Sequence, residues 1–170
     1  MKYVQLDNAT FLPHVCQLID EGHSVTIRAK GNSMRPFIES DRDSVILGRA
    51  DNVEVGDVVL VELTKGQYVL HRLDAVQGQR IRLRGDGNPY QVEICSVTNV
   101  RAKAVAVVRK GREYSTNSRT WKIYSWFWTR ALPLRRYLLA LYRLLWLGIL
   151  PGRLTGKNST AGVNNNDNDK

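Results

Sequence analysis

Hydrophobic residues recur with two different periods along the first two thirds of the chain. Near the N-terminus four of them follow the i, i+4, i+7, i+8 spacing of one helical face: Phe11, Val15, Leu18 and Ile19. Thr10 stands at the expected N-cap, and Gly22 follows the last periodic residue, as is typical of a helix end. Pro13 falls in the first turn, where its missing N–H breaks no internal hydrogen bond. The pattern predicts a short helix within residues 1–23.

After residue 23 the spacing changes to short, β-branched runs that are typical of strands. The predicted strands cover residues 24–29, 44–47, 58–63, 67–75, 79–84 and 102–109. Gly66 lies in a three-residue connection, 64–66, that predicts a hairpin between two of these strands. The runs indicate a mainly β fold class, with a compact antiparallel β domain over residues 24–112.

Beyond Gly111 the chain is rich in tryptophan and leucine, and we expect an amphipathic helical segment over residues 113–154. Residues 137–150 are almost entirely apolar, with Arg143 as their only charge. As a helix they would reach about 21 Å, less than the roughly 30 Å hydrocarbon core of a bilayer. Arg136, Ala140 and Arg143 share one side, so this segment is expected to lie in a membrane interface. The alternative is a helix that simply packs on its own domain.

The charge distribution supports a membrane surface as a partner. The chain has 170 residues, of which 43% are apolar, and a net charge of +9. Residues 121–157 hold seven basic and no acidic side chains, interleaved with tryptophan and leucine. This pattern favours an anionic membrane as the partner. We do not expect nucleic acid as a partner. The N-terminus lacks the apolar core of a signal peptide, so the cytoplasmic side is expected. Residues 155–170 are polar and predict disorder.

Two cysteines and two of the histidines carry no predicted chemistry. Cys16 and Cys95 are too few and too far apart for a four-ligand metal site, and nothing marks them as a disulfide pair. We therefore expect two buried free thiols and no metal or other cofactor. His14 and His23 flank the predicted helix, and a solvated surface role is expected for both.

The main candidate for chemistry is the serine of Gly-Asn-Ser-Met-Arg-Pro-Phe, residues 31–37, which directly follow a predicted strand. Gly31 permits a positive φ and Pro36 fixes the exit from the turn, so Ser33 is predicted to sit on a stiff support. A serine hydroxyl reacts only where a base removes its proton and donors receive the oxyanion. Taken alone, such a turn is more often only a turn.

Two later segments complete a pattern. His71 lies in the β-type run 69–73, and Asp86 lies in the glycine-bracketed turn 84–88. The three segments together resemble the signal peptidase and LexA-type serine peptidase superfamily, whose members carry a Ser-Met-x-Pro box, a later strand with the base and a Gly-Asp-x-Asn box. His71 followed by Arg72 resembles the archaeal and endoplasmic-reticulum signal peptidases, in which the base is histidine rather than lysine.

The resemblance implies a Ser-His-Asp mechanism. Ser33 would attack the peptide carbonyl, His71 would accept its proton, and Asp86 would orient the imidazole. Asp74 is the rival orienting acid, and Asp86 as a simple turn residue remains an alternative. His71 also remains open as a core histidine, because it shares a strand face with two apolar residues, Val69 and Leu73.

The oxyanion hole and the cleft are less completely defined. The Ser33 backbone N–H would be one oxyanion donor. Some signal peptidases add a serine hydroxyl two residues earlier, but Gly31 stands there in this chain, so the second donor is unidentified. Met34 and Pro36 are expected to shape the substrate cleft.

These features predict a membrane-associated serine endopeptidase that acts on an extended polypeptide laid along a strand edge. Two alternatives remain. One is a membrane-associated binding module that has the same fold without turnover. The other is a self-cleaving LexA-type regulator, which the histidine base and the missing helix-turn-helix disfavour.

Overall fold

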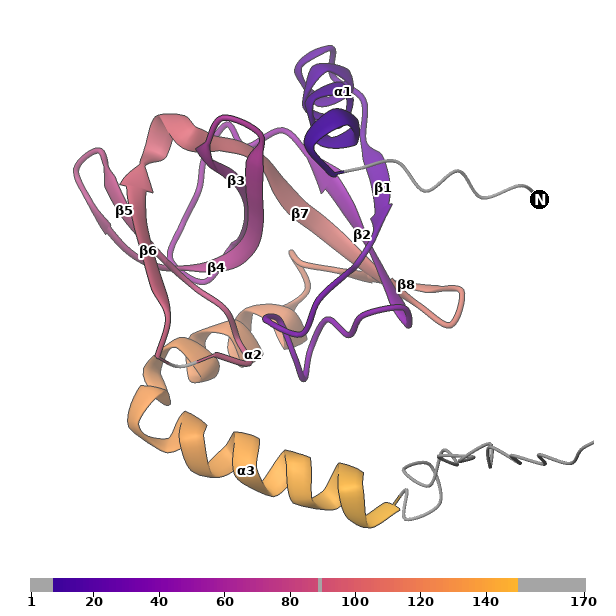
Figure 1. Ribbon diagram of the computed structural model, residues 1–170, viewed down its shortest axis with the longest axis vertical. Coiled ribbons are helices and arrows are strands. Elements are labelled where there is room, and N and C mark those ends of the chain that lie inside the picture. The colour runs from indigo at the N-terminus through magenta and orange to yellow at the C-terminus, as the bar shows by residue number, and fades with distance from the viewer. Residues whose placement is uncertain (1–7, 89, 150–170) are drawn as a thin grey trace, which may run out of the picture.

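Eight strands form one strongly bent, mainly antiparallel sheet in residues 8–88 and 90–149, which the computed structural model describes (Figure 1). The strands are β1 (Val25–Arg28), β2 (Asp43–Gly48), β3 (Val58–Thr64), β4 (Gln67–Gln77), β5 (Arg80–Arg84), β6 (Val92–Ser96), β7 (Val100–Arg109) and β8 (Arg112–Ser115). Their order in the sheet is β1-β2-β7-β3-β4-β5-β6, with β8 also paired to β7. The predicted mainly β fold class is therefore confirmed.

The apolar faces of the strands enclose two cores. The larger core lies between the sheet and α1 (Asn8–Asp20), whose Val15 and Ile19 pack with strand residues such as Val45 and Leu60. The smaller core, formed on the inner side of β3, β4 and β5, is centred on Leu73. The helix includes Thr10, so the predicted N-cap position is wrong. Strand β3 contributes to both cores, because its alternate residues point to opposite faces: Val58 and Leu60 to the larger core, Val59 and Val61 to the smaller.

The prediction missed β6 and β8 for a physical reason. All four residues of β8 are exposed, so they carry no apolar alternation. In β6 the polarity is inverted, because Val92 and Ile94 face solvent while the Glu93 side chain is about nine-tenths buried. Strand β8 therefore lacks the hydrophobic pattern that identifies a strand in a sequence, whereas Val92 and Ile94 of β6 alternate with Glu93 but lie on the exposed face. The predicted domain boundary at residues 112 and 113 consequently falls inside β8.

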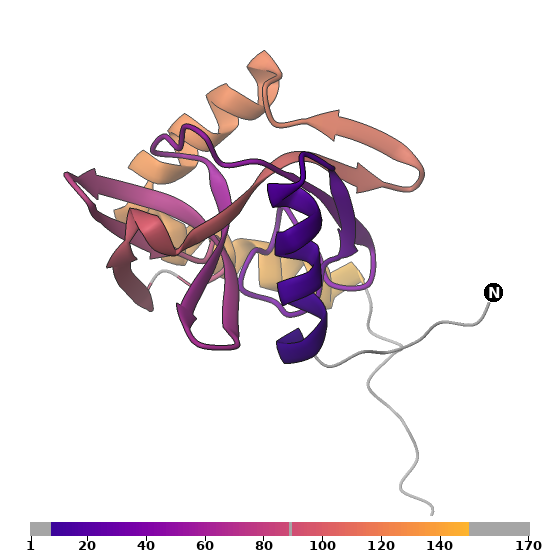
Figure 2. The same ribbon diagram turned by 90° about the horizontal axis from the view of Figure 1, so that it is seen from above.

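Two helices follow the sheet, α2 (Arg119–Arg130) and α3 (Leu132–Ile149). Ser118 caps α2, since its Oγ accepts a hydrogen bond from the Trp121 amide at 3.3 Å. The two helices lie at the opposite end of the molecule from α1 in Figure 1. Figure 2 shows the molecule from the α1 end. Among the described residues no helix is long and apolar enough to cross a membrane. The predicted disorder of residues 155–170 concerns a part of the chain outside the described residues.

Candidate active site

Ser33 lies in the long connection between β1 and β2. Gly31 has a φ of +89°, a conformation that side chains rarely adopt, and it turns the chain immediately before the serine. The amide of Arg35 donates to the Asn32 carbonyl at 3.2 Å, which closes the turn around Ser33. Ser33 itself is half-buried, and the Met34 side chain behind it is buried in the larger core. The serine is thus held between the core and solvent.

The glycine-rich turn after β5 supports this connection through the main chain. The Gly87 amide donates to the Ser33 carbonyl at 2.7 Å. A Cβ on Gly85 would lie 2.6 Å from the same carbonyl oxygen, and a Cβ on Gly87 would lie 2.8 Å from the Asn32 carbonyl oxygen. No larger residue fits at either position without displacing the serine turn. The two glycines therefore act as a cradle for Ser33, and we call them the glycine cradle.

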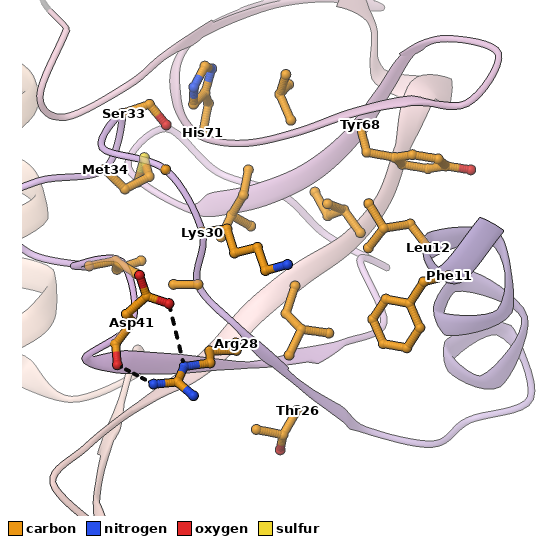
Figure 3. Close-up of a pocket in the computed structure, with 17 residues that line it drawn as sticks. Phe11, Leu12, Thr26, Arg28, Lys30, Ser33, Met34, Asp41, Tyr68 and His71 are labelled. Carbon is orange, nitrogen blue, oxygen red and sulfur yellow. Dashed lines mark hydrogen bonds and ion pairs between the residues drawn. The ribbon is translucent and has the colours of Figure 1, made fainter. Parts of the chain in front are cut away.

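A cavity of about 640 Å³ opens beside Ser33 and ends against α1 (Figure 3). Ser33 and His71 line the same end of the cavity, and Figure 3 shows their side chains as neighbours. Phe11 and Leu12 of α1 close the other end, and the Lys30 side chain extends into the space between. The described residues make no hydrogen bond between Ser33 and His71.

Two free strand edges border the cavity. Within the described residues β1 pairs with β2 alone, and residues 26–30 line the cavity consecutively. On the facing side β4 pairs with β5 only from Arg72 onward, which leaves residues 68–71 with one free edge, and these also line the cavity consecutively. Consecutive lining by both strands shows that backbone edges as well as side chains face the cavity, because side chains alone would alternate.

His71 is anchored by a carboxylate that the sequence did not identify. Its Nδ1 lies 2.9 Å from Oε2 of Glu93, and both side chains are about nine-tenths buried. The pairing follows from the sheet register, because Leu73 pairs with Leu83 and Leu83 pairs with Glu93. Glu93 therefore shares a sheet face with Leu73 and with His71, two residues earlier on β4. Among the described residues His71 makes no other hydrogen bond, so its Nε2 is available toward the cavity.

Asp86 contacts Arg72, not His71, so the expected Asp86–His71 pairing is wrong in this structure. Arg72 Nε and Nη2 donate to the two Asp86 carboxylate oxygens at 2.8 and 2.6 Å. Both side chains are almost completely buried. Burial alone would lower the pKa of Arg72, but the adjacent Asp86 carboxylate outweighs it and raises that pKa. The reason is the strand alternation, which points Arg72 to the opposite face from His71.

The rival acid, Asp74, does not reach His71 either. Its carboxylate accepts from Arg82 Nε at 2.9 Å and from Arg84 Nη2 at 3.3 Å. Asp74 lies three residues after His71, so alternation places the two side chains on opposite faces of β4. Both acids that the sequence offered therefore neutralise arginines.

The remaining predicted site residues divide into two groups. Gly31 and Met34 line the cavity with Ser33, whereas Pro36 does not, although its peptide bond to Arg35 is cis. The described residues include no group of three or more metal-ligating side chains that could hold an ion.

The C-terminal helices complete the support of the site. Arg72 Nη1 donates to the Gly56 carbonyl at 2.6 Å and to Ser125 Oγ of α2 at 2.7 Å. The Tyr124 and Trp128 rings of the same helix pack against Phe37, with centroids 3.5 and 5.2 Å away. Helix α2 therefore contacts both the residue after His71 and the connection that carries Ser33.

A buried ion cluster fixes the end of that connection. Asp43, which begins β2, accepts hydrogen bonds from the Glu39 amide at 3.0 Å and from Arg42 and Arg109. Arg109 also donates to the Phe37 carbonyl. Burial would raise the pKa of Asp43, but these hydrogen bonds outweigh it and lower the pKa to about 2.

Comparison with known proteins identifies the family of the chain. The family model described as Peptidase S24-like matches residues 2–109, which contain α1, the first seven strands and all the predicted site residues. The comparison with curated proteins found no match to this chain. Since the family model covers more than half of the chain, and its match contains the serine turn, the His71 strand and the glycine cradle, the chain belongs to the Peptidase S24-like family.

Proposed function

We propose that this protein is a serine endopeptidase in which Ser33 is the nucleophile, His71 the general base and Glu93 the residue that orients His71. The observation that carries the proposal is the 2.9 Å contact between His71 Nδ1 and Glu93. A carboxylate on Nδ1 fixes the tautomer in which Nε2 is the proton acceptor, and it stabilises the imidazolium that forms. This is the chemical role that the resemblance had assigned to Asp86.

The reaction would proceed in two steps. His71 takes the Ser33 proton while Oγ attacks the peptide carbonyl, and the imidazolium then gives that proton to the leaving amine as the C–N bond breaks. In the second step His71 takes a proton from water, and the resulting hydroxide attacks the acyl-serine ester. The ester C–O bond breaks, and the proton returns to Ser33 Oγ. The Ser33 amide is the first oxyanion donor in this proposal.

The substrate that fits the cavity is an extended polypeptide. It would pair with the free edges of β1 and β4, which supply backbone donors and acceptors on both sides. Apolar side chains of the substrate would contact Leu12 and Ile27. Lys30 reaches into the same space, so substrates with a basic side chain at that point are disfavoured by like charge.

A peptide-library digest tests the proposal. The wild-type protein is expected to cleave, and Ser33→Ala is expected to abolish cleavage while the protein keeps its melting temperature. Cleavage that survives Ser33→Ala, or an inactive wild type that still binds extended peptides, would contradict the assignment, and the second result would favour the binding module.

Self-cleavage is the second activity compatible with the family. It differs in kinetic order, because an intramolecular cut proceeds at a rate that does not depend on protein concentration. Incubation of the purified chain at two concentrations, followed by intact-mass analysis of wild type and Ser33→Ala, distinguishes a self-cleaving regulator from an enzyme that acts on other chains.

A further inference from the structure

Helices α2 and α3 expose a row of large apolar side chains. On α3 five of them recur at i, i+3, i+7, i+10 and i+11 and are each more than half exposed: Leu134, Tyr137, Leu141, Leu144 and Leu145. Three more lie on α2, with exposures between 49 and 69%: Ile123, Trp126 and Phe127. We call these eight residues the exposed helix face. The helical period places the α3 members on one stripe.

The stripe is distinct from the side of α3 that packs on the protein. Arg135 and Leu139 are buried, and Tyr142 donates to Glu39 Oε1 at 3.0 Å. One side of the helix is thus attached to the rest of the molecule, which leaves the apolar stripe in solvent. Contiguous exposed apolar surface on a helix indicates an interaction site, because single scattered apolar residues are the norm elsewhere on a protein surface.

The charge around this face indicates what covers it. Residues 119–149 contain six lysines and arginines and no aspartate or glutamate. Arg136 and Arg143 are exposed and seven residues apart, so they lie on the same flank of α3. On α2 the Arg130 guanidinium lies 4.5 Å from the centre of the Trp126 ring. Tryptophan, leucine and flanking arginine together match the boundary between lipid tails and anionic head groups.

We propose that the exposed helix face binds an anionic lipid bilayer, with α3 lying in the plane of the interface. The proposal does not rest on peptidase activity. A second copy of the chain fits less well, because two such faces would bring twelve basic side chains together without a counter-charge. Nucleic acid would leave the leucine stripe uncovered. The structure supports an interfacial rather than a spanning helix, since α3 reaches only about 27 Å and carries arginines.

Vesicle flotation of the full chain tests the proposal. Binding is expected to vesicles of phosphatidylcholine with phosphatidylglycerol, and it should weaken with added salt without vanishing. Leu141→Glu with Leu144→Glu should reduce the partition coefficient by about tenfold or more for each leucine. Arg136→Gln with Arg143→Gln should reduce binding to anionic vesicles and leave the weak binding to pure phosphatidylcholine unchanged.

A matched control distinguishes lipid binding by the exposed helix face from nonspecific binding through any exposed apolar residue. Ile94 on β6 is 58% exposed, close to the exposures of Leu141 and Leu144, but it lies outside the two helices. Ile94→Glu should float like the wild type. Circular dichroism confirms that each variant is folded before flotation.

Three outcomes would overturn the proposal. One is absence of flotation of the wild type. Another is equal flotation of the wild type and Leu141→Glu/Leu144→Glu. The third is a wild-type dimer, detected by light scattering without lipid, that the double variant dissociates and that does not bind vesicles; this would assign the face to a second copy.

Discussion

At the scale of single residues, the site depends on which of the three carboxylates, Glu93, Asp86 or Asp74, contacts His71. Glu93 lies on His71, while Asp86 is fully committed to Arg72. A carboxylate that orients a catalytic histidine affects turnover, whereas one that neutralises a buried arginine affects stability. The two acids should therefore be separable by experiment.

Glu93→Gln is expected to lower kcat by about 100-fold or more, because the amide no longer stabilises the imidazolium. The melting temperature should change little, since Gln can still accept a hydrogen bond from Nδ1. Asp86→Asn is the matched comparison, and it should lower the melting temperature because Arg72 loses its buried counter-ion. Peptide-cleavage assays measure kcat, and thermal unfolding measures the melting temperature, for both variants. A Glu93→Gln variant with wild-type turnover would exclude Glu93 as the orienting residue.

Asp43 makes folding sensitive to acid. Its pKa is lowered from 3.8 to about 2 in the folded protein, so the unfolded chain binds a proton more readily than the folded one. The stability that Asp43 contributes is therefore complete above about pH 5 and is lost as the pH falls toward 2. Asp43→Asn should lower stability at pH 7 and flatten its dependence on pH below 5. Urea unfolding at a series of pH values measures the effect, and parallel curves for both proteins would contradict it.

At the scale of elements, α2 is the support of the site. It supplies Ser125 to Arg72 and two aromatic rings to Phe37. Helix α3 adds Arg135, which is almost completely buried and donates through Nε to the Trp128 carbonyl. Its Nη1 is buried without a hydrogen-bond partner among the described residues. Of these two buried arginines, Arg72 pairs with a carboxylate, whereas Arg135 has no such pair within the part of the chain that the structure describes.

Substituting each of these arginines by methionine should have opposite effects. Arg72→Met leaves Asp86 buried without a partner, and we expect a loss of about 3–5 kcal/mol in the free energy of unfolding. Arg135→Met removes a charge whose pKa burial already lowers, so stability should be unchanged or higher. Chemical denaturation of both variants tests this. A large loss with Arg135→Met would show that Arg135 has a counter-charge in solution.

The sequence predicted the strands whose apolar residues lie in the core, and it missed β6 and β8, whose large apolar residues are exposed. The runs that became β1 to β5 and β7 were identified from their β-branched residues and from the turns between them; β3 is a continuous apolar run because both of its faces are buried. Strand β6 has Glu93 on its inner side and Ile94 outside, so the usual alternation with apolar residues inside would place Glu93 in solvent and away from His71. Arg72 and Ser125 are 53 positions apart, and no local pattern encodes such a pair. Ser33 and His71 could be identified from the sequence because both belong to motifs of the superfamily that the chain resembles.

At the scale of the whole molecule, the exposed helix face and the cavity are connected through a few contacts. Tyr142 of α3 bonds Glu39, and Phe37 packs on α2, so both helices contact the connection that carries Ser33. A bilayer bound to these helices would hold the peptidase domain close to substrates that are themselves attached to the membrane.

If the exposed helix face binds a bilayer as proposed, loss of that binding should affect substrates selectively. Leu141→Glu/Leu144→Glu is expected to leave kcat/KM on a short soluble peptide unchanged, because neither residue lines the cavity. On the same peptide linked to a lipid in anionic vesicles, the rate should fall by about tenfold or more, because the enzyme is no longer concentrated at the surface. The measurement is the ratio of the cleavage rate on the lipid-linked peptide to that on the soluble peptide, for the wild type and for the double variant. An equal fall on both would indicate damage to the site instead of lost recruitment.

The glycine cradle has a consequence for chemical trapping. Gly85 and Gly87 contact the serine turn through carbonyl oxygens and Ser33 Cβ, so the cradle does not depend on which atom stands at the γ position. The site can therefore accept Ser33→Cys without remodelling and present a thiol at the mouth of the cavity. Burial raises the pKa of both natural thiols, Cys16 and Cys95, which makes them slow to alkylate. An electrophile carried on an extended peptide would then label position 33 selectively and hold the bound strand in place as a covalent adduct.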